Sequence, residues 1–354
     1  MDLNQQVSIE HAELYQQWRN SGVGVYFVVY DLLPVRLPHR FPPGAGALHA
    51  AWLAVVAHAD GALCISQFVA DDLRVWLSNQ STAARPTLQV AAFPLGHDIE
   101  NSVPTRGLPE DAGQVMGHLA ARPTFLMVGT VEPRKGHAQT LAAFEQLWAQ
   151  GIDINLAIVG KQGWMVESLV DILRGHKENG QRLFWLEGIS DEYLERIYNI
   201  STGLIAASEG EGSGLPLIEA TRYGLPIIAR DIPVFREVTC GHALYFPNTR
   251  EASSIAQTVR DWLALPKEDT RLLHTLFPTR HGKTARGAFW KSSGSCPSRL
   301  STVMSASLVA RHDGSVLRPK RNVGRWWGLL FQGLAFIRVL SHLHLSHLNS
   351  GDSR

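Results

Sequence analysis

The sequence predicts an α/β fold built on parallel β-sheets, and three observations support this. Apolar runs of strand length alternate with stretches of helix length, most regularly over residues 124–265. The strand-length runs are apolar at nearly every position, as expected for strands that are covered on both faces. Loops bearing glycine and charged residues follow several of these runs, at the edge where parallel sheets bind their ligands.

The first hundred residues alternate helix and strand but contain only about three strands. Residues 9–19 are expected to form a helix, and residues 102–111, with two prolines and a glycine, indicate a linker. Strands are expected at 23–30, 61–66 and 87–93, and helices at 45–57 and from 67 to Trp76. Three strands are few for an independent doubly wound domain.

The regular part of the chain predicts five or six further strands. Strands are expected at 124–130, 154–160, 182–187, 203–207, 226–229 and 243–246. Helices are expected at 136–150, 164–174, 191–199, after the glycine loop near 214, and at 252–265. Ser190 or Asp191 is a plausible N-cap for the third of these helices.

Two carboxylates flank a glycine-rich loop in the stretch S-E-G-E-G-S-G-L-P-L-I-E-A, residues 208–220. Glu211 and Glu219 lie eight positions apart, with Gly212 and Gly214 between them. A glycine loop that opens a helix presents free N–H groups, which suit an anion. The pattern is suited to a sugar linked to a nucleotide diphosphate. The alternative is a glycine-rich turn with two solvated glutamates.

Two adjacent cations follow the strand at 124–130, in the loop E-P-R-K-G. Arg134 offers a bidentate fork and Lys135 a point charge, and both suit a diphosphate at the start of a helix. The alternative is a basic loop on a solvated edge. Two anion-suited loops at strand ends of one sheet favour the diphosphate.

Charge is distributed unevenly along the chain of 354 residues. Its net charge of +1 gives no reason to expect nucleic acid or another polyanion as a partner. Residues 279–354 hold 12 Lys+Arg and 2 Asp+Glu, a net of +10, whereas the preceding residues carry a net of −9. Three widely spaced cysteines and a start without a signal-peptide pattern fit a reduced, cytoplasmic setting.

Several motifs together resemble the carboxyl-terminal half of retaining glycosyltransferases of family 4, and most of all the bacterial mannosyltransferase-like members that build surface polysaccharides. These motifs are V-G-T-V-E-P-R-K-G-H, A-I-V-G-K-Q-G-W, L-E-G-I-S-D-E-Y-L, S-E-G-E-G-S-G-L-P-L-I-E-A and A-R-D-I-P-V-F-R-E-V. The resemblance implies the GT-B architecture, two facing Rossmann-like domains, with the first incomplete here. It predicts an acceptor-side domain at 1–110, a nucleotide-sugar-binding domain at 111–278 and a basic tail at 279–354.

The resemblance also implies roles for the charged residues of the two loops. Arg134 and Lys135 would bind the diphosphate, and with Glu211, which would hold sugar hydroxyls, they are the candidate catalytic residues. Glu219 would hold the ribose hydroxyls. No metal and no cofactor is implied beyond the donor substrate, because cationic side chains occupy the metal's role.

Further substrate-binding positions follow from the same motifs. The backbone at Gly214 and Leu215 would cradle the phosphate, and the loop from Gly188 to Asp191 would lie near the base. Gly96, in L-G-H-D, resembles an inter-domain position near the donor.

Three departures from the family pattern stand out. Ser213 occupies a position where the family usually has Phe or Cys. The family's first strands, its glycine-rich acceptor loop and its catalytic-region histidine are not matched. The basic tail replaces an expected closing helix; it is either an interfacial membrane helix behind a basic patch or an extraneous extension. A metal site at His342, His344 and His347 is not expected.

The resemblance therefore implies a glycosyltransferase that transfers mannose from GDP-mannose to a saccharide or lipid-linked saccharide acceptor with retention. Its expected location is the cytoplasm, with peripheral contact at the inner face of the plasma membrane if the tail is an anchor. The alternatives are a truncated, non-catalytic nucleotide-sugar-binding module and a structural βαβ protein without a ligand. Because the first domain is incomplete, weak donor binding and little transfer are expected.

Overall fold

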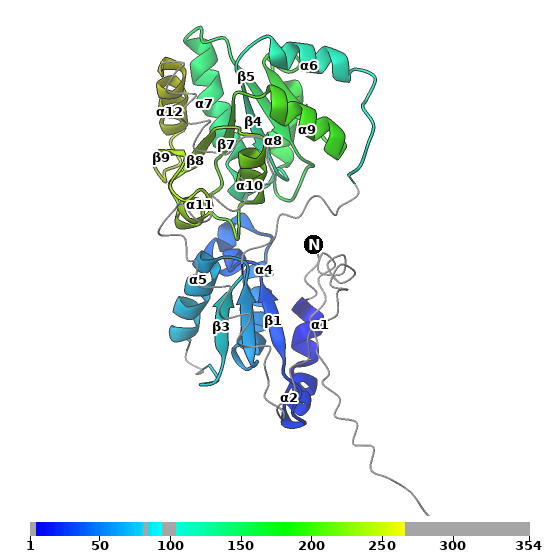
Figure 1. Ribbon diagram of the computed structural model, residues 1–354, viewed down its shortest axis with the longest axis vertical. Coiled ribbons are helices and arrows are strands. Elements are labelled where there is room, and N and C mark those ends of the chain that lie inside the picture. The colour runs from blue at the N-terminus through cyan, green and yellow to red at the C-terminus, as the bar shows by residue number, and fades with distance from the viewer. Residues whose placement is uncertain (1–4, 81–83, 94–103, 266–354) are drawn as a thin grey trace, which may run out of the picture.

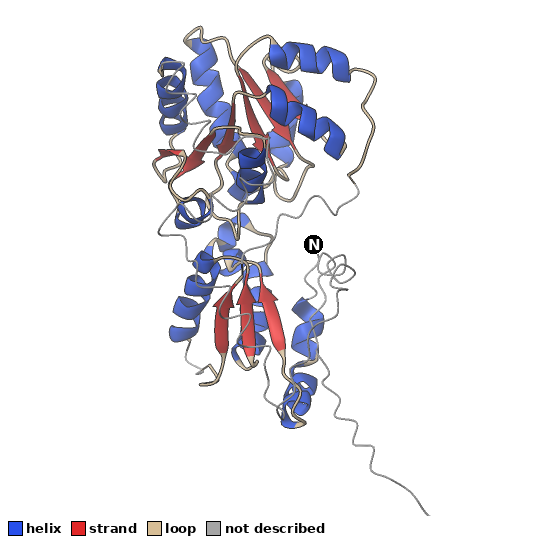
Figure 2. Ribbon diagram, in the orientation of Figure 1, coloured by secondary structure: helices blue, strands red, loops and turns tan. Residues whose placement is uncertain are grey.

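The computed structural model of the chain describes residues 5–80, 84–93 and 104–265. These residues form two parallel sheets, each flanked by helices, which lie one above the other along the longest axis (Figures 1 and 2). Gly96 and the basic tail at 279–354, with His342, His344 and His347, lie outside the described residues. Among the described helices, none combines the length and the apolar character needed to cross a bilayer.

The smaller sheet has the strand order β1-β2-β3 with all neighbours parallel, which confirms the three predicted strands. Its strands are β1 (Tyr26–Val29), β2 (Gly61–Cys64) and β3 (Gln89–Ala92). Its helices are α1 (Gln5–Glu10), α2 (Ala12–Asn20), α3 (Leu33–Arg36), α4 (Ala45–Ala57) and α5 (Gln67–Ser78). The single helix predicted over 9–19 is therefore interrupted, because the backbone at His11 leaves helical geometry.

The larger sheet has the order β6-β5-β4-β7-β8-β9, again with all neighbours parallel. Its strands are β4 (Thr124–Val128), β5 (Asn155–Val159), β6 (Leu183–Leu186), β7 (Gly203–Ala206), β8 (Ile227–Arg230) and β9 (Leu244–Phe246). The chain runs from β4 outward to β6, then returns to β7 on the other side of β4. Such a reversal of strand order places a crevice at the carboxyl ends of β4 and β7.

Helices cover both faces of the larger sheet, and each face has its own apolar core. One face is covered by α7 (His137–Ala149), α8 (Glu167–Gly175) and α12 (Ala252–Ala264). The other is covered by α6 (Ala112–Ala120), α9 (Asp191–Ile200), α10 (Leu215–Arg222) and α11 (Pro233–Val238). The sequence did not predict α6 or α11. The predicted start of α8 at Trp164 was also too early, since Met165 has a φ of 54° that a helix does not allow.

The two sheets meet through the glycine loop that follows β7. Ser66, the N-cap of α5, donates a hydrogen bond of 2.7 Å to the carbonyl of Gly212. A Cβ on Gly212 would lie 2.1 Å from the carbonyl oxygen of Tyr30, so only glycine allows this approach. The carboxylate of Glu237 accepts two 2.8 Å bonds from amides at the start of α5, where it caps that helix. The first domain therefore closes over the loop at residues 208–214.

Candidate functional site

The reversal in strand order brings together the two loops that the sequence singled out. A short 3₁₀ turn, η3 (Pro133–Lys135), follows β4, and the glycine loop follows β7. Gly136 holds them in contact, because its φ is +75° and a Cβ there would lie 2.3 Å from the carbonyl of Ala207. Neither the conformation nor the approach suits a larger residue.

Glu211 is the centre of a buried ion network. Its carboxylate lies 2.5 Å from Nζ of Lys135 and 3.2 Å from Arg134, and it accepts a 2.7 Å bond from Ser208. Arg134 also lies 3.0 Å from Glu132. The four charged side chains are between 8% and 15% exposed. The predicted diphosphate-binding cations are thus together, and the carboxylates of Glu211 and Glu132 balance their charge.

The cations determine the charge state of Glu211. Burial acts to raise the pKa of Glu211, but the attraction of Lys135 and Arg134 outweighs it and holds that pKa below its ordinary value. Burial prevails at Glu132, where the pKa is raised despite the same two cations. Glu211 is therefore the anion that these cations hold.

Asp31 joins this network from the first domain, and the sequence did not identify it. It follows β1, and its carboxylate accepts a 2.9 Å bond from the amide of Leu33. Burial raises the pKa of Asp31, while Arg134 and His49 oppose that shift. Asp31 could have been noticed as the first residue of D-L-L-P, at the carboxyl end of a predicted strand. Its proximity to Arg134 could not be predicted, because it depends on how the two domains meet.

Glu219 lies in a different set of contacts. Its carboxylate accepts a 2.9 Å hydrogen bond from the hydroxyl of Tyr198 on α9, and Tyr198 stacks on Tyr223. Burial raises the pKa of Glu219. The described contacts of Glu219 thus connect α10 with α9. They do not involve Arg134 or Lys135, the cations that contact Glu211.

The glycine loop opens α10 as the sequence predicts. Gly214 has a left-handed backbone, with φ at +66°, at the N-cap of α10. Leu215 is the first residue of α10, and its side chain is exposed. Amides at such a helix start have no partner within the helix, which suits an oxyanion.

The loop after β6 carries the other predicted positions. Gly188 has a φ of +61°, and Ser190 caps α9 by accepting a 3.1 Å bond from Tyr193. Asp191 accepts two bonds of 2.8 Å from the amide and hydroxyl of Thr105. Thr105 of the predicted linker is thus bonded to the loop from Gly188 to Asp191, which is expected to lie near the base of the donor nucleotide.

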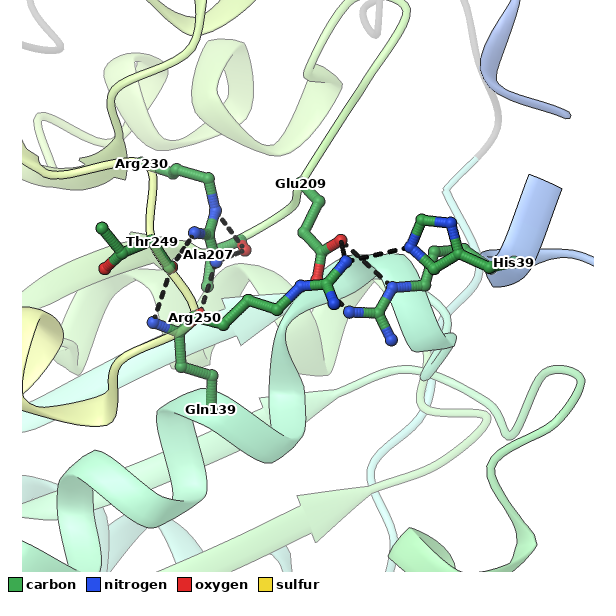
Figure 3. A network of polar contacts seen from close by, with 8 residues as sticks. His39, Gln139, Ala207, Glu209, Arg230, Thr249 and Arg250 are labelled. Carbon is green, nitrogen blue, oxygen red and sulfur yellow. Dashed lines mark hydrogen bonds and ion pairs between the residues drawn. The ribbon is translucent and has the colours of Figure 1, made fainter. Parts of the chain in front are cut away.

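A second network of contacts lies between the domains beside the first (Figure 3). Glu209 accepts hydrogen bonds from Arg40 of the first domain, at 3.1 Å through Nε, and from Arg250, at 3.2 Å. Arg250 also contacts His39 at 2.9 Å. No sequence pattern predicted that these residues, far apart in the chain, would meet.

Arg230 is an almost fully buried cation at the end of β8. It is 1% exposed and donates to the carbonyls of Ala207 and Thr249 and to the side chain of Gln139 (Figure 3). Burial lowers its pKa. These bonds join the start of the glycine loop to α7.

Among the described residues, no group of three or more His, Cys, Asp or Glu side chains is arranged to hold a metal ion.

Comparison with known proteins gives a family model and curated relatives. Residues 114–274 match the model described as glycosyl transferases group 1. The chain is 49% identical over 254 residues to the serotype-specific mannosyltransferase WbdA of Escherichia coli, over 71% of this chain and 31% of that protein. It is 31% identical over 141 residues to the O-antigen chain mannosyltransferase B of Escherichia coli, over 38% of this chain and 36% of that protein. The chain thus spans about a third of these relatives' length.

Solved structures show the same architecture. Anabaena Alr3699/HepE in complex with UDP and glucose aligns with a TM-score of 0.59 and 16% identity, over 85% of this chain and 76% of that one. Sucrose-phosphate synthase from Thermosynechococcus elongatus aligns with a TM-score of 0.52 and 21% identity, over 80% of this chain and 68% of that one. The chain has the GT-B fold, which confirms the predicted fold class.

Proposed function

We propose that this chain is a glycosyltransferase that transfers mannose from GDP-mannose to a saccharide or lipid-linked saccharide acceptor, with retention at the anomeric carbon. The observation that carries the proposal is the buried triad of Arg134, Lys135 and Glu211 at the reversal of strand order. The mannosyl group and its use in surface polysaccharide synthesis are inferred from the names of the relatives. The proposed location is the cytoplasm.

In this proposal the donor's diphosphate takes the place of Glu211 on the two cations. Arg134 and Lys135 can each donate charge-assisted hydrogen bonds to phosphate oxygens. The amides of Gly214 and Leu215, at the start of α10, supply further donors. Glu211, once displaced, is an acceptor at the edge of the same site for the hydroxyls of the hexose.

The nucleoside would extend along the other predicted positions. Glu219 would accept from the ribose hydroxyls, in exchange for or beside Tyr198. The loop from Gly188 to Asp191 would lie along the base. No cofactor is proposed.

The transfer itself requires charge stabilisation above all. The bond between the anomeric carbon and the diphosphate oxygen breaks, and a bond to the acceptor's hydroxyl oxygen forms on the same face. The hydroxyl proton passes to the departing diphosphate, whose developing charge Arg134 and Lys135 stabilise in a buried site. No side chain need act as the general base in this scheme.

Parallel measurements of binding and turnover test the proposal. Calorimetry with GDP-mannose should give weak but saturable heat. Incubation with mannose-terminated saccharides should extend them by one hexose only slowly, because the first sheet has only three strands, and mass spectrometry detects the product. NMR of the product would show whether the new linkage retains the α configuration. Binding without transfer to any acceptor would favour the non-catalytic module, and failure to bind any nucleotide diphosphate sugar would contradict both.

A further inference from the structure

A cavity of about 270 Å³ lies beside the ion network and is not used by the proposed donor site. Its walls come from Arg40 of the first domain, from the turn and helix start at 132–139, from the start of α8, and from Glu209 and Arg250. Its volume is close to the lower end of the range for small-molecule sites.

The charges that line this cavity are balanced, which favours a neutral ligand. Arg40 and Arg250 both donate to Glu209, and with Glu132 the lining holds two positive and two negative side chains (Figure 3). The remaining charged residue of the lining is Glu132, which pairs with Arg134. His137 is neutral, because burial lowers its pKa to about 3.

Two polar side chains of the lining each have one buried atom without a hydrogen-bond partner in the described structure. Oε2 of Glu132 has none, although the guanidinium of Arg134 forms an ion pair with it at 3.0 Å. Nδ1 of His137 also has none. The two residues are 7% and 2% exposed, so water does not freely replace the missing partner. Both residues line the cavity, and a hydroxyl group both donates and accepts, so a polyhydroxylated ligand would satisfy either atom once the side chain turns it toward the cavity.

The cavity also has an apolar wall. Pro133, Met165, Val166 and Leu169 line it, and the side chain of Met165 is 48% exposed. Polar groups that fix orientation beside an apolar surface are the usual composition of a small-molecule site. A hexose presents both kinds of surface, with hydroxyls at its edge and C–H groups on its faces.

The cavity adjoins the site proposed for the donor's sugar. His137 lines both this cavity and the small one beneath the loop that bears Glu211. Glu132 is linked to Glu211 through Arg134, which pairs with both. A ligand in the cavity would therefore lie beside the hexose that Glu211 is proposed to orient.

We infer that this cavity is the subsite for a neutral hexose unit of the acceptor saccharide. The inference rests on the proposed function. In that proposal the donor lies at Glu211, and Arg134 stands between Glu211 and Glu132 of the cavity. The same chemistry would admit the hexose of the donor itself, so the experiment must separate the two sources.

Labelling with ¹³C at the methionine methyl groups gives a direct report from the cavity wall. Met165 lines this cavity, whereas Met127 is buried in β4 and lines the other one. The full chain is titrated with methyl α-D-mannopyranoside, with and without GDP, and Met165→Leu assigns the signal. The saccharide should shift the Met165 signal and leave that of Met127 in place.

Two matched variants test the assignment by filling the cavity. Ser168 lines it on an exposed turn of α8, and its neighbour Glu167 is exposed but does not line it. Ser168→Phe should weaken binding of the mannoside at least about tenfold, and Glu167→Phe should change it less than about twofold. Binding of GDP should be equal in the wild type and both variants, which also shows that they fold.

Each contrary result has a distinct meaning. No shift of Met165 in the wild type, or equal mannoside affinity in Ser168→Phe, would overturn the subsite. If GDP-mannose alone shifts Met165 and GDP does not, the cavity holds the donor's hexose and the acceptor assignment is wrong. Loss of GDP binding in every chain would instead contradict the proposed function, while the titration without nucleotide still decides the subsite.

Discussion

Replacing Glu211 by Gln should change the affinity for GDP and the affinity for GDP-mannose by different factors. The carboxylate occupies both cations in the structure, with Lys135 at 2.5 Å and Arg134 at 3.2 Å. A diphosphate must displace it before it can bind them. Glu211→Gln should therefore tighten the binding of free GDP, while it removes the charged acceptor proposed for the hexose.

The size of each effect follows from the hydrogen bonds exchanged. A hydrogen bond to a charged group contributes about 1.5–3 kcal/mol and one between neutral groups about 0.5–1.5 kcal/mol. Displacing an amide instead of a carboxylate should then cost about 1–2 kcal/mol less, so GDP should bind about 5- to 30-fold more tightly. The amide introduced by Glu211→Gln can still form a neutral hydrogen bond to the hexose, so exchanging the charged bond for a neutral one should raise the ratio of the GDP-mannose Kd to the GDP Kd by about 5- to 30-fold.

Calorimetry with GDP and GDP-mannose on the same preparations measures both quantities. Glu145→Gln is the matched control, because Glu145 lies on the surface of α7 and pairs with His176, away from the cations. If Glu211→Gln weakened GDP and GDP-mannose by the same factor, Glu211 would be supporting the loop rather than competing with phosphate, and the reasoning would be refuted.

The remaining predictions concern other parts of the crevice. Changing Lys135 or Arg134 to Ala should weaken GDP binding by about 1–3 kcal/mol in calorimetry, and unchanged affinity would remove them from the phosphate site. Glu219→Ala should weaken GDP and GDP-mannose alike, because its proposed partner is the ribose; loss confined to GDP-mannose would reverse that assignment. Arg40→Ala should speed hydrogen exchange in residues 208–214, since it removes an inter-domain contact, and unaltered exchange would mean that the contact does not hold the domains together. Burial holds the pKa of His137 near 3, so only the unfolded chain takes up this proton as the pH falls below 6.5, and the free energy of unfolding should decrease. Melting temperatures of His137→Gln should fall less steeply over that window, and parallel curves would contradict the assignment.

Much of the fold follows from the sequence because buried parallel strands have a distinctive composition. The runs that became β4 and β7 are apolar at almost every position, and each is followed by a glycine-bearing loop. The shorter helices α6 and α11 were missed for a local reason. The first contains Gly113 and Gly117, and the second begins at Pro233. Glycine lowers helix propensity, and in α6 packing against the sheet outweighs that cost. Proline usually indicates a loop, but at the first position of a helix, as at Pro233, it is favourable.

The site was predictable only up to the level of single loops. Arg134, Lys135 and Glu211 could be identified, since each follows a strand in a recognisable pattern. The contact of Glu211 with the two cations could not be predicted. It depends on β4 and β7 being neighbours in the sheet, although β5 and β6 lie between them in the sequence. The roles of Asp31 and Arg40 could not be predicted for a similar reason, since Arg134 and Glu209, which they face, lie in the other domain.

The close packing of Gly212 on the carbonyl of Tyr30 has a consequence for the kinetics of substrate capture. The loop that is proposed to receive the donor also touches the first domain, and the cavity beneath it measures only about 20 Å³. A nucleotide sugar cannot be admitted until the domains move apart. The observed association rate should then stop rising at high donor concentration and approach a ceiling, which is the rate at which the closed form opens. A side chain at position 212 would hold the domains apart, so that capture would become faster while the closed, water-excluding state was lost.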